Sequence, residues 1–235
     1  MSSDIYPFPI ALSRLANRES RESQTLRAVR WLLEQDANPV VLVTPRRDFS
    51  SVSLKALAGR AGVTHLTWRT FSPGSLAGCR VVHAWPNREH LNKLWGVRPA
   101  ALVVVEWNES DSAEWLEDAA PVLLLPGGAR SLSSVAPAPM VNLPEDVASI
   151  LTSTARWAAG YSGGLKWNEE DKLKVDMMNR PARWADVTVE QVRTKCRELG
   201  MQPKDVDTVA DFLQRRKEGR RFNVRSSYRD FHFGS

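Results

Sequence analysis

The strongest constraint on the fold is a series of five short runs of aliphatic and β-branched residues between positions 40 and 126. Each run is almost continuously apolar, which is typical of strands that are covered on both faces, as in a parallel sheet. The runs are VVLVT at 40–44, THLTW at 64–68, CRVVHAW at 79–85, ALVVVEW at 101–107 and PVLLL at 121–125. We therefore expect a five-stranded, mostly parallel, open sheet.

Segments with helical periodicity separate or flank these runs, and several of them carry capping residues. They cover residues 20–36, 53–62, 87–96, 110–119 and 144–160. Strands that alternate with helices at this spacing indicate an open α/β fold. The pattern resembles a RecA-like or Rossmann-like half-domain, and this resemblance concerns the fold alone, because such folds host many unrelated functions.

The chain divides into three parts by composition. Residues 1–164 hold the predicted strands and an N-terminal helix, and the sequence YSGG at 161–164 is a predicted hinge. Residues 165–219 form a helical segment, in which Thr188 and Gln191 make a predicted capping box and Pro203 opens a further helix. Residues 220–235 are a basic, aromatic tail. We expect an α/β domain, a helical segment and a tail.

Composition also indicates a compartment. The longest apolar run spans only residues 100–105, far short of the roughly 20 residues that a membrane-spanning helix needs. The N-terminus lacks the basic and apolar regions of a secretory signal. Cys79 and Cys196 have neither the spacing of a zinc site nor that of a disulfide framework. We expect a cytoplasmic protein with reduced thiols, and we predict no membrane partner, metal or cofactor.

The motifs that would identify a reaction do not occur. GxxxxGK[ST], GxGxxG, GxSxG, HExxH and CxxC are all missing, and TPRRD follows the first run, where its arginines would obstruct a pyrophosphate. Glu106 and Glu109 could share acid and base work, or hold a metal with Asp111. Paired acids before a helix more often interact with the helix dipole. The catalytic residues are therefore unknown, and whether the chain is an enzyme stays open.

One alternative function rests on the carboxyl ends of the strands, where open parallel sheets bind ligands. Arg46 and Arg47 follow the first run, and Gly127, Gly128 and Arg130 follow the last. A Gly-Gly turn can present backbone N–H groups to an anion that arginines also contact. The chain would then be a small α/β enzyme acting on a phosphorylated or otherwise anionic ligand. The competing interpretation is that every α/β fold places polar loops at this edge.

The positive charge of the chain is concentrated near the C-terminus. The formal net charge is +5, and residues 214–229 contribute +6, so the rest of the chain carries −1. Arginine binds phosphates through two hydrogen bonds, and aromatic faces accept bases. The leading hypothesis is a non-catalytic binding protein for DNA or RNA. Its predicted nucleic-acid-binding residues are Arg215, Arg216, Lys217, Arg220, Arg221, Arg225, Tyr228 and Arg229.

The same composition also suits an arm that docks on a protein. In this alternative, the chain is a structural subunit whose tail grips a protein partner, or the tail docks on its own domain. Docking on the chain's own domain would bury Phe222, Phe231 and Phe233 against residues 1–164. The arginines would then pair with acids such as Glu109 or Asp111.

The chain is rich in tryptophan. It has nine tryptophans, all between Trp31 and Trp184, and most of them lie within or beside apolar patterns. We interpret them as core residues with hydrogen bonds at the rim, in preference to platforms for base stacking. His65 and His83 lie inside predicted strands and are expected to be hydrogen-bonded core or rim residues, in preference to catalysts.

Overall fold

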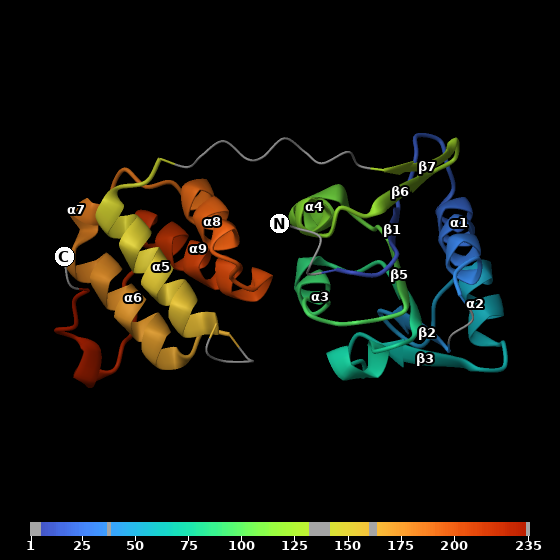
Figure 1. The fold of residues 1–235 in the computed structure, drawn as a ribbon, viewed down its shortest axis with the longest axis horizontal. Helices are drawn as coiled ribbons and strands as arrows, with labels where there is room; N and C mark the ends of the chain where they lie inside the picture. Colours follow the sequence, from blue (N-terminus) through green and yellow to red (C-terminus); the bar gives the residue numbers. More distant parts are fainter. Residues whose placement is uncertain (1–5, 37–38, 132–141, 160–163, 234–235) are drawn as a thin grey trace. The chain divides into compact units, whose positions relative to one another are not determined.

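The computed structural model describes residues 6–36, 39–131, 142–159 and 164–233. The chain folds as two compact units, Met1–Ala136 and Pro137–Ser235, which we call the α/β unit and the helical unit (Figure 1). This division differs from the predicted boundary at residue 164, because helix α5 (Glu145–Ala159) packs with helices of the second unit. The predicted hinge lies, except for Gly164, outside the described residues.

A seven-stranded sheet, counted over the described residues, forms the middle of the α/β unit, with the strand order β3-β2-β4-β5-β1-β6-β7. All pairs are parallel except that of β7 with β6. The mostly parallel sheet is confirmed, and the five predicted runs are β2 to β6. The strands are β1 (Ile10–Ser13), β2 (Val40–Thr44), β3 (Val63–Thr67), β4 (Arg80–Ala84), β5 (Ala101–Val105), β6 (Val122–Leu125) and β7 (Gly128–Ser131).

The number of strands differs from five because the sequence pattern does not predict β1 or β7. Strand β1 is fully buried, and its Leu12 pairs with Val104 of β5 and Leu123 of β6. Four residues that follow Pro9 are too few to show a periodicity. Strand β7 is exposed and forms a hairpin with β6, and its sequence GARS has little β-propensity.

Helices cover both faces of the sheet (Figure 1). On one face, α1 (Arg21–Leu33) and α2 (Val52–Ala58) bury Leu32 and Leu54 against strand residues such as Leu42. On the other face, α3 (Arg88–Asn92), α4 (Glu109–Ala119) and the 3-10 turn η2 (Pro73–Leu76) bury Leu91 and Trp115. A buried side chain of this size stabilises the fold by about 1.5–3 kcal/mol. The connections after β1 and β2 therefore leave the sheet toward one face, and those after β4 and β5 leave toward the other.

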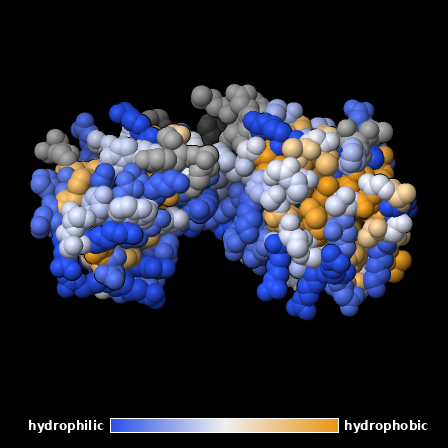
Figure 2. Space-filling view, turned by 90° about the horizontal axis from the view of Figure 1, so that it is seen from below, coloured by the Kyte–Doolittle hydropathy of each residue, from blue (hydrophilic) through white to orange (hydrophobic). Residues whose placement is uncertain are grey.

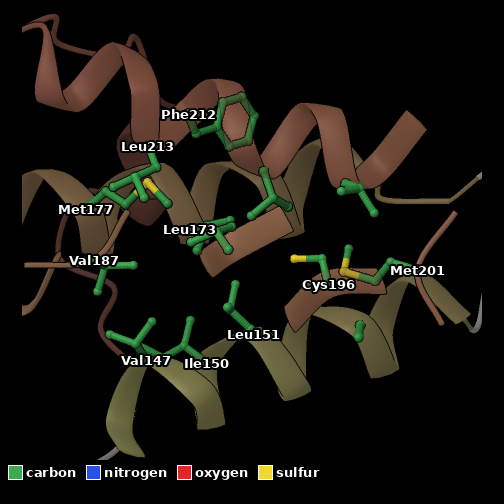
Figure 3. Packing of buried hydrophobic residues seen from close by; sticks show 14 of the residues in the cluster. Val147, Ile150, Leu151, Leu173, Met177, Val187, Cys196, Met201, Phe212 and Leu213 are labelled. Atoms are coloured by element: carbon green, nitrogen blue, oxygen red, sulfur yellow. The ribbon is translucent and has the colours of Figure 1, made fainter. Parts of the chain in front are cut away.

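The helical unit has a core of its own, in which side chains from several helices point toward one another (Figure 3). Leu151 of α5, Leu173 of α6, Cys196 of α8 and Phe212 of α9 are among them. The predicted capping box of α8 and the predicted proline start of α9 are confirmed. Besides α5, the elements of this unit are α6 (Trp167–Asn179), α7 (Pro181–Trp184), α8 (Val189–Glu198), α9 (Pro203–Lys217) and the 3-10 turn η3 (Ser226–Tyr228).

The chain enters α6 through a position that only glycine fits. Gly164 has a φ of +73°, and a Cβ atom added there would collide with the carboxylate of Asp205. That carboxylate accepts a hydrogen bond from the Leu165 backbone N–H at 3.2 Å. The start of α6 is thereby tied to the start of α9.

Candidate functional site

A cleft of about 890 Å³ lies at the carboxyl ends of the strands in the α/β unit. We call it the strand-end cleft. Trp68, Trp85 and Trp107 line it, each one or two positions after β3, β4 or β5, together with residues in the range 45–52 after β2. Its remaining wall is the first part of α1, with Arg21, Glu22 and Thr25. The cleft thus lies where connections to opposite faces of the sheet diverge, which is where open α/β sheets bind ligands.

The three tryptophans form an aromatic wall that is only partly covered by protein. The rings of Trp85 and Trp107 are edge to face, with centroids 6.3 Å apart, and Trp68 packs on the ring of His90 at 4.1 Å. Trp107 is 57% exposed, and the guanidinium of Arg21 lies over its ring at 4.4 Å. Trp68 and Trp85 also pack on the hydrophobic cores, as expected, whereas the exposed Trp107 differs from the core tryptophan that the sequence led us to expect.

Two indole groups in this wall lack hydrogen-bond partners. The Nε1 atoms of Trp68 and Trp85 are buried and have no acceptor among the described residues. Buried donors are nearly always paired, and an unpaired one costs about 1–3 kcal/mol. Trp85 also has a φ of 55°, in the left-handed region that bulky residues rarely adopt. Unpaired donors and backbone strain of this kind are typical of binding sites.

The charged side chains of the cleft differ in whether they have partners. Glu22 accepts hydrogen bonds from the backbone N–H groups of Val52 and Ser53 at 3.2 and 2.6 Å. Burial alone would raise the pKa of Glu22, but these bonds and that from the Ser53 hydroxyl lower it below its ordinary value. Arg46 and Asp48 are exposed, and in the described part of the chain their side chains have no hydrogen-bond or ion-pair partner.

Next to the cleft, a polar network holds the loop that follows β1. Arg14 makes two hydrogen bonds with the buried carboxylate of Glu106, at 2.7 and 2.8 Å, and the Ser112 hydroxyl also donates to this carboxylate. The Gln24 amide bridges the carbonyl groups at the ends of β1 and β5, with both bonds 2.8 Å long. Glu106 is therefore an ion-pair partner with a structural role. Glu109 lies exposed at the start of α4, 3.6 Å from Arg14.

The residues of the predicted anion site do not come together. Arg46 lines the strand-end cleft, whereas Arg47 is not in the lining, and its charge helps burial to lower the pKa of His65 on the edge strand β3. Gly127 and Gly128 form the β6–β7 hairpin. Strands β4, β5 and β1 separate β2 from β6, a lateral distance of about 19 Å at about 4.8 Å per strand. Strand order thus prevents convergence, and Arg130 is exposed on the outermost strand β7.

His83 lies behind the aromatic wall and is fully buried. Neither ring nitrogen has a hydrogen-bond partner among the described residues, and the ring packs edge-on to Phe71 at 5.3 Å. Burial, with a smaller contribution from His90, lowers the pKa of His83 from 6.5 to about 3. The imidazole is therefore neutral at physiological pH. His65 is half-buried, with its Nε2 2.7 Å from the Thr44 hydroxyl. His65 is thus the expected hydrogen-bonded rim residue, whereas His83 is a core residue without the expected hydrogen bond.

The second candidate region is residues 220–233, which we call the C-terminal segment. Its aromatic rings pack on helices of the helical unit. Phe233 is 7% exposed and stacks on Trp157 of α5 with centroids 5.7 Å apart. Phe222 packs on Phe212 of α9 at 5.5 Å, and Phe231 packs edge-on to Phe233 at 5.1 Å. The rings are anchors, as the docking alternative expects. They dock on the helical unit that adjoins them in the chain, of which only α5 lies within residues 1–164.

The ion pair of this segment also differs from the partners expected for docking. Arg225 lies 3.0 Å from Asp171 of α6, and its guanidinium is 3.7 Å over the ring of Trp167. Tyr228 packs edge-on to the same ring at 6.1 Å. Because the segment lies against α6, Asp171 takes the place of the expected Glu109 and Asp111.

The other cations of the region lie at or near the surface. Arg215 pairs with Asp211 at 2.9 Å and Arg220 with Glu218 at 3.1 Å, and such surface pairs contribute only about 0–1 kcal/mol. Arg216 and Lys217 donate to backbone carbonyl groups, at Arg220 and Ala185. Arg221 and Arg229 are exposed, with no side-chain partner within the residues that the structure describes.

Comparison with known proteins finds no matching family model and no match among curated proteins or solved structures. Over the described residues, there is no group of three or more His, Cys, Asp or Glu side chains that could hold a metal ion. None of the helices in this part of the chain combines the length and the apolarity that crossing a bilayer requires. The site geometry alone therefore carries the functional argument.

Proposed function

We propose that the protein is a non-catalytic binding protein that associates with DNA or RNA through the cations of residues 215–229. One observation carries this proposal. In the C-terminal segment the aromatic rings pack on helices and fix the segment, whereas the cations stay exposed. Anchored rings hold the neighbouring arginines in a fixed region of the surface. Binding a phosphate backbone then costs less conformational entropy than it would for a free tail.

The chemistry of these side chains supports the same function. Arginine matches the geometry of phosphate oxygens, and each cation that neutralises a phosphate releases a counterion from the nucleic acid. Arg221 and Arg229 have no competing partner among the described residues, and Arg220 has only a surface pair. We therefore expect these three arginines to contact phosphates. Tyr228 and Arg225 contribute less, since both are engaged with Trp167.

In this proposal the α/β unit is a scaffold. Its mostly parallel sheet fits the Rossmann-like or RecA-like resemblance, although its strand order differs from the order 3-2-1-4-5-6. A phosphate-binding loop would stand between the first strand and the first helix, where this chain has the Arg14–Glu106 network instead. We expect no ATP hydrolysis there. We place the protein in the cytoplasm, where Cys79 and Cys196, which form no disulfide, would stay reduced.

The test replaces Arg220, Arg221 and Arg229 together by glutamine and measures binding of a labelled oligothymidylate of about 20 nucleotides by fluorescence anisotropy. If the three arginines contact phosphates, the slope of log affinity against log salt becomes less negative by about 2, from about 0.7 per phosphate on a single strand. Duplex DNA and RNA of the same length identify the preferred form. The matched control replaces the exposed Arg47, Arg60 and Arg69 of the α/β unit, which removes the same charge.

An equal change of slope in both triple variants would show that only net charge matters, and it would contradict the proposal. The proposal is also contradicted if the wild-type protein binds none of the three nucleic acids. The melting temperature of both variants should match that of the wild type, because all six side chains are exposed.

A further inference from the structure

We propose that the strand-end cleft binds a flat heteroaromatic ring that carries an anionic group, as a nucleoside monophosphate does. The inference goes beyond the proposed nucleic-acid surface, since it concerns the other unit and other side chains. Four properties of the cleft carry it: its position and size, its aromatic wall, its unpaired N–H donors and its free cation.

Position and size fit a small-molecule site. The cleft lies at the divergence of the strand connections, and its volume of about 890 Å³ is within the range of about 300–1,000 Å³ for such sites. The first turn of α1 lines the cleft, but the connection between β1 and α1 does not form a phosphate-binding loop. The Arg14–Glu106 pair occupies the exit of β1, and β5 and β4 lie between β1 and β2, whose following loop supplies Arg46.

The aromatic wall selects a flat ring. Trp85 and Trp107 present their rings edge to face, and Phe49 belongs to the same lining. Trp107 is held by Arg21, whose guanidinium lies over its ring and donates hydrogen bonds to the Glu106 and Trp107 carbonyl groups, both 3.0 Å long. More than half of the Trp107 side chain nevertheless stays exposed. A ring fixed in this way is a stacking platform that loses little freedom when a ligand binds.

The unpaired donors select a heterocycle. The buried N–H groups of Trp68 and Trp85 need acceptors, and none is present among the described residues. The ring nitrogens and carbonyl oxygens of a purine or pyrimidine supply acceptors in the plane of a stacked ring, whereas a hydrocarbon ring supplies none. Both side chains line the cleft and their N–H groups are covered by protein, so a ligand of this class pairs with them once an indole ring turns its N–H edge toward it.

The charges select an anion. Arg46 is exposed and without a side-chain partner in the described chain, so its guanidinium is available for a phosphate or carboxylate group. Glu22 is already engaged by the backbone at the start of α2. Asp48 remains free to accept from an exocyclic amino group. The lining therefore carries two arginines and two carboxylates, of which Arg46 and Asp48 are available to a ligand.

A free mononucleotide and one unstacked nucleotide of a single strand share this chemistry. The experiment therefore titrates the full-length protein with AMP, GMP, CMP and UMP by calorimetry, and separately with an oligothymidylate. Adenosine, which lacks the phosphate, and ribose 5-phosphate, which lacks the ring, should both bind more weakly than AMP. Each of these comparisons removes one of the two recognised groups.

Two exposed side chains of the cleft provide the variants. Trp107→Ala should weaken nucleotide binding about fivefold or more, the lower end of the range for loss of a stacked base. Arg46→Gln should weaken it about tenfold or more, through loss of a charge-assisted hydrogen bond. The matched controls are Trp167→Ala and Arg47→Gln. Trp167 is 52% exposed in the helical unit, and Arg47 adjoins Arg46 but does not line the cleft. Both controls should bind nucleotides as the wild type does.

The titration in which binding is observed shows whether the ligand is a free mononucleotide or one nucleotide of a strand. Binding of free mononucleotides that Trp107→Ala weakens assigns the cleft to a small ligand. If only the oligothymidylate binds and Trp107→Ala weakens it without changing the salt slope, the cleft holds one nucleotide of a strand. The proposal is overturned if neither titration responds to the cleft variants, or if ribose 5-phosphate binds as tightly as AMP. The glutamine variant of Arg220, Arg221 and Arg229 should keep mononucleotide binding, so failure of the nucleic-acid proposal is distinguishable.

Discussion

In the helical unit, Phe222 and Phe233 pack against helices of the same unit, and the arginines between them stay exposed. In the α/β unit, Trp107 stays exposed beside the free Arg46 at the ends of packed strands. Figure 2 shows hydrophobic residues over a larger part of the α/β unit than of the helical unit on the face that it displays. Aromatic rings close to arginines are thus packed against protein in the helical unit, whereas in the α/β unit such a ring is exposed.

The difference lies in the backbone that carries the rings. The C-terminal segment contains only one short 3-10 turn, so its backbone can bend until each ring reaches an apolar surface. Trp85 directly follows a strand that is paired on both sides, and its backbone N–H, unlike its indole N–H, has an acceptor, the Val105 carbonyl at 2.8 Å. A ring attached to such a backbone stays where the sheet places it, even when its N–H group finds no acceptor. Rings on rigid element ends therefore form open sites, and rings on irregular segments become anchors.

Truncating a buried anchor ring should change the free energy of unfolding more than any other substitution that tests this comparison. Phe233→Ala should lower the free energy of unfolding of the helical unit by about 3 kcal/mol, the lower end for truncation of a buried phenylalanine. Hydrogen exchange followed by mass spectrometry should show lost protection in α5 and α9 and unchanged protection in the α/β unit. The exposed neighbour His232→Ala is the control and should change stability by less than about 0.5 kcal/mol. A loss below about 1 kcal/mol for Phe233→Ala would show that the ring does not anchor the segment.

An intermediate effect concerns the buried imidazole behind the aromatic wall. The pKa of His83 is about 3 in the folded protein against 6.5 as its ordinary value, so only the unfolded state binds this proton between these pH values. The free energy of unfolding of the α/β unit should therefore fall as the pH falls below 6.5, reaching about 2 kcal/mol of loss at about pH 5. Urea unfolding at about pH 7.5 and about pH 5 should show that His83→Leu reduces the loss by about this amount and leaves the part that comes from the lowered pKa values of His65 and His90.

The control for this pH effect is His232→Leu, which removes an exposed imidazole from the helical unit. It should leave the pH dependence of the α/β unit unchanged. Equal pH dependence in the wild type and in His83→Leu would mean that the buried ring gains a partner or water on protonation, and the expected burial effect would be wrong.

The smallest effect is expected at the open wall. Trp107→Ala should change the free energy of unfolding by less than about 1 kcal/mol, because the side chain is exposed and mainly loses its contact with Arg21. Equilibrium urea unfolding measures this change alongside nucleotide affinity. A destabilisation of about 3 kcal/mol would show that Trp107 is an anchor like Phe233, and the contrast between the two units would fail.

Features that depend on local sequence could be predicted from the sequence. The continuous apolarity of segments such as 40–44 and 101–105 identified the strands that are buried on both faces. The hydrogen-bonding side chains of Thr188 and Gln191 identified the start of α8. Burial, periodicity and capping act over a few residues, and a few residues are enough to reveal them. Strand β1 was not predicted because its four buried residues are too few to give any of these signals.

The candidate sites depended on distances between segments that are far apart in the chain. Arg46 and Gly127 each follow a parallel strand, as the sequence indicated, but β4, β5 and β1 lie between their strands. Strand order is set by how crossover connections pack over the sheet, and no local pattern encodes it. The same packing brings Trp85 and Trp107 to one cleft, and packing within the helical unit joins Phe233 to Trp157. The sequence determined the type and direction of most strands, and tertiary packing alone decided which of their ends share a site.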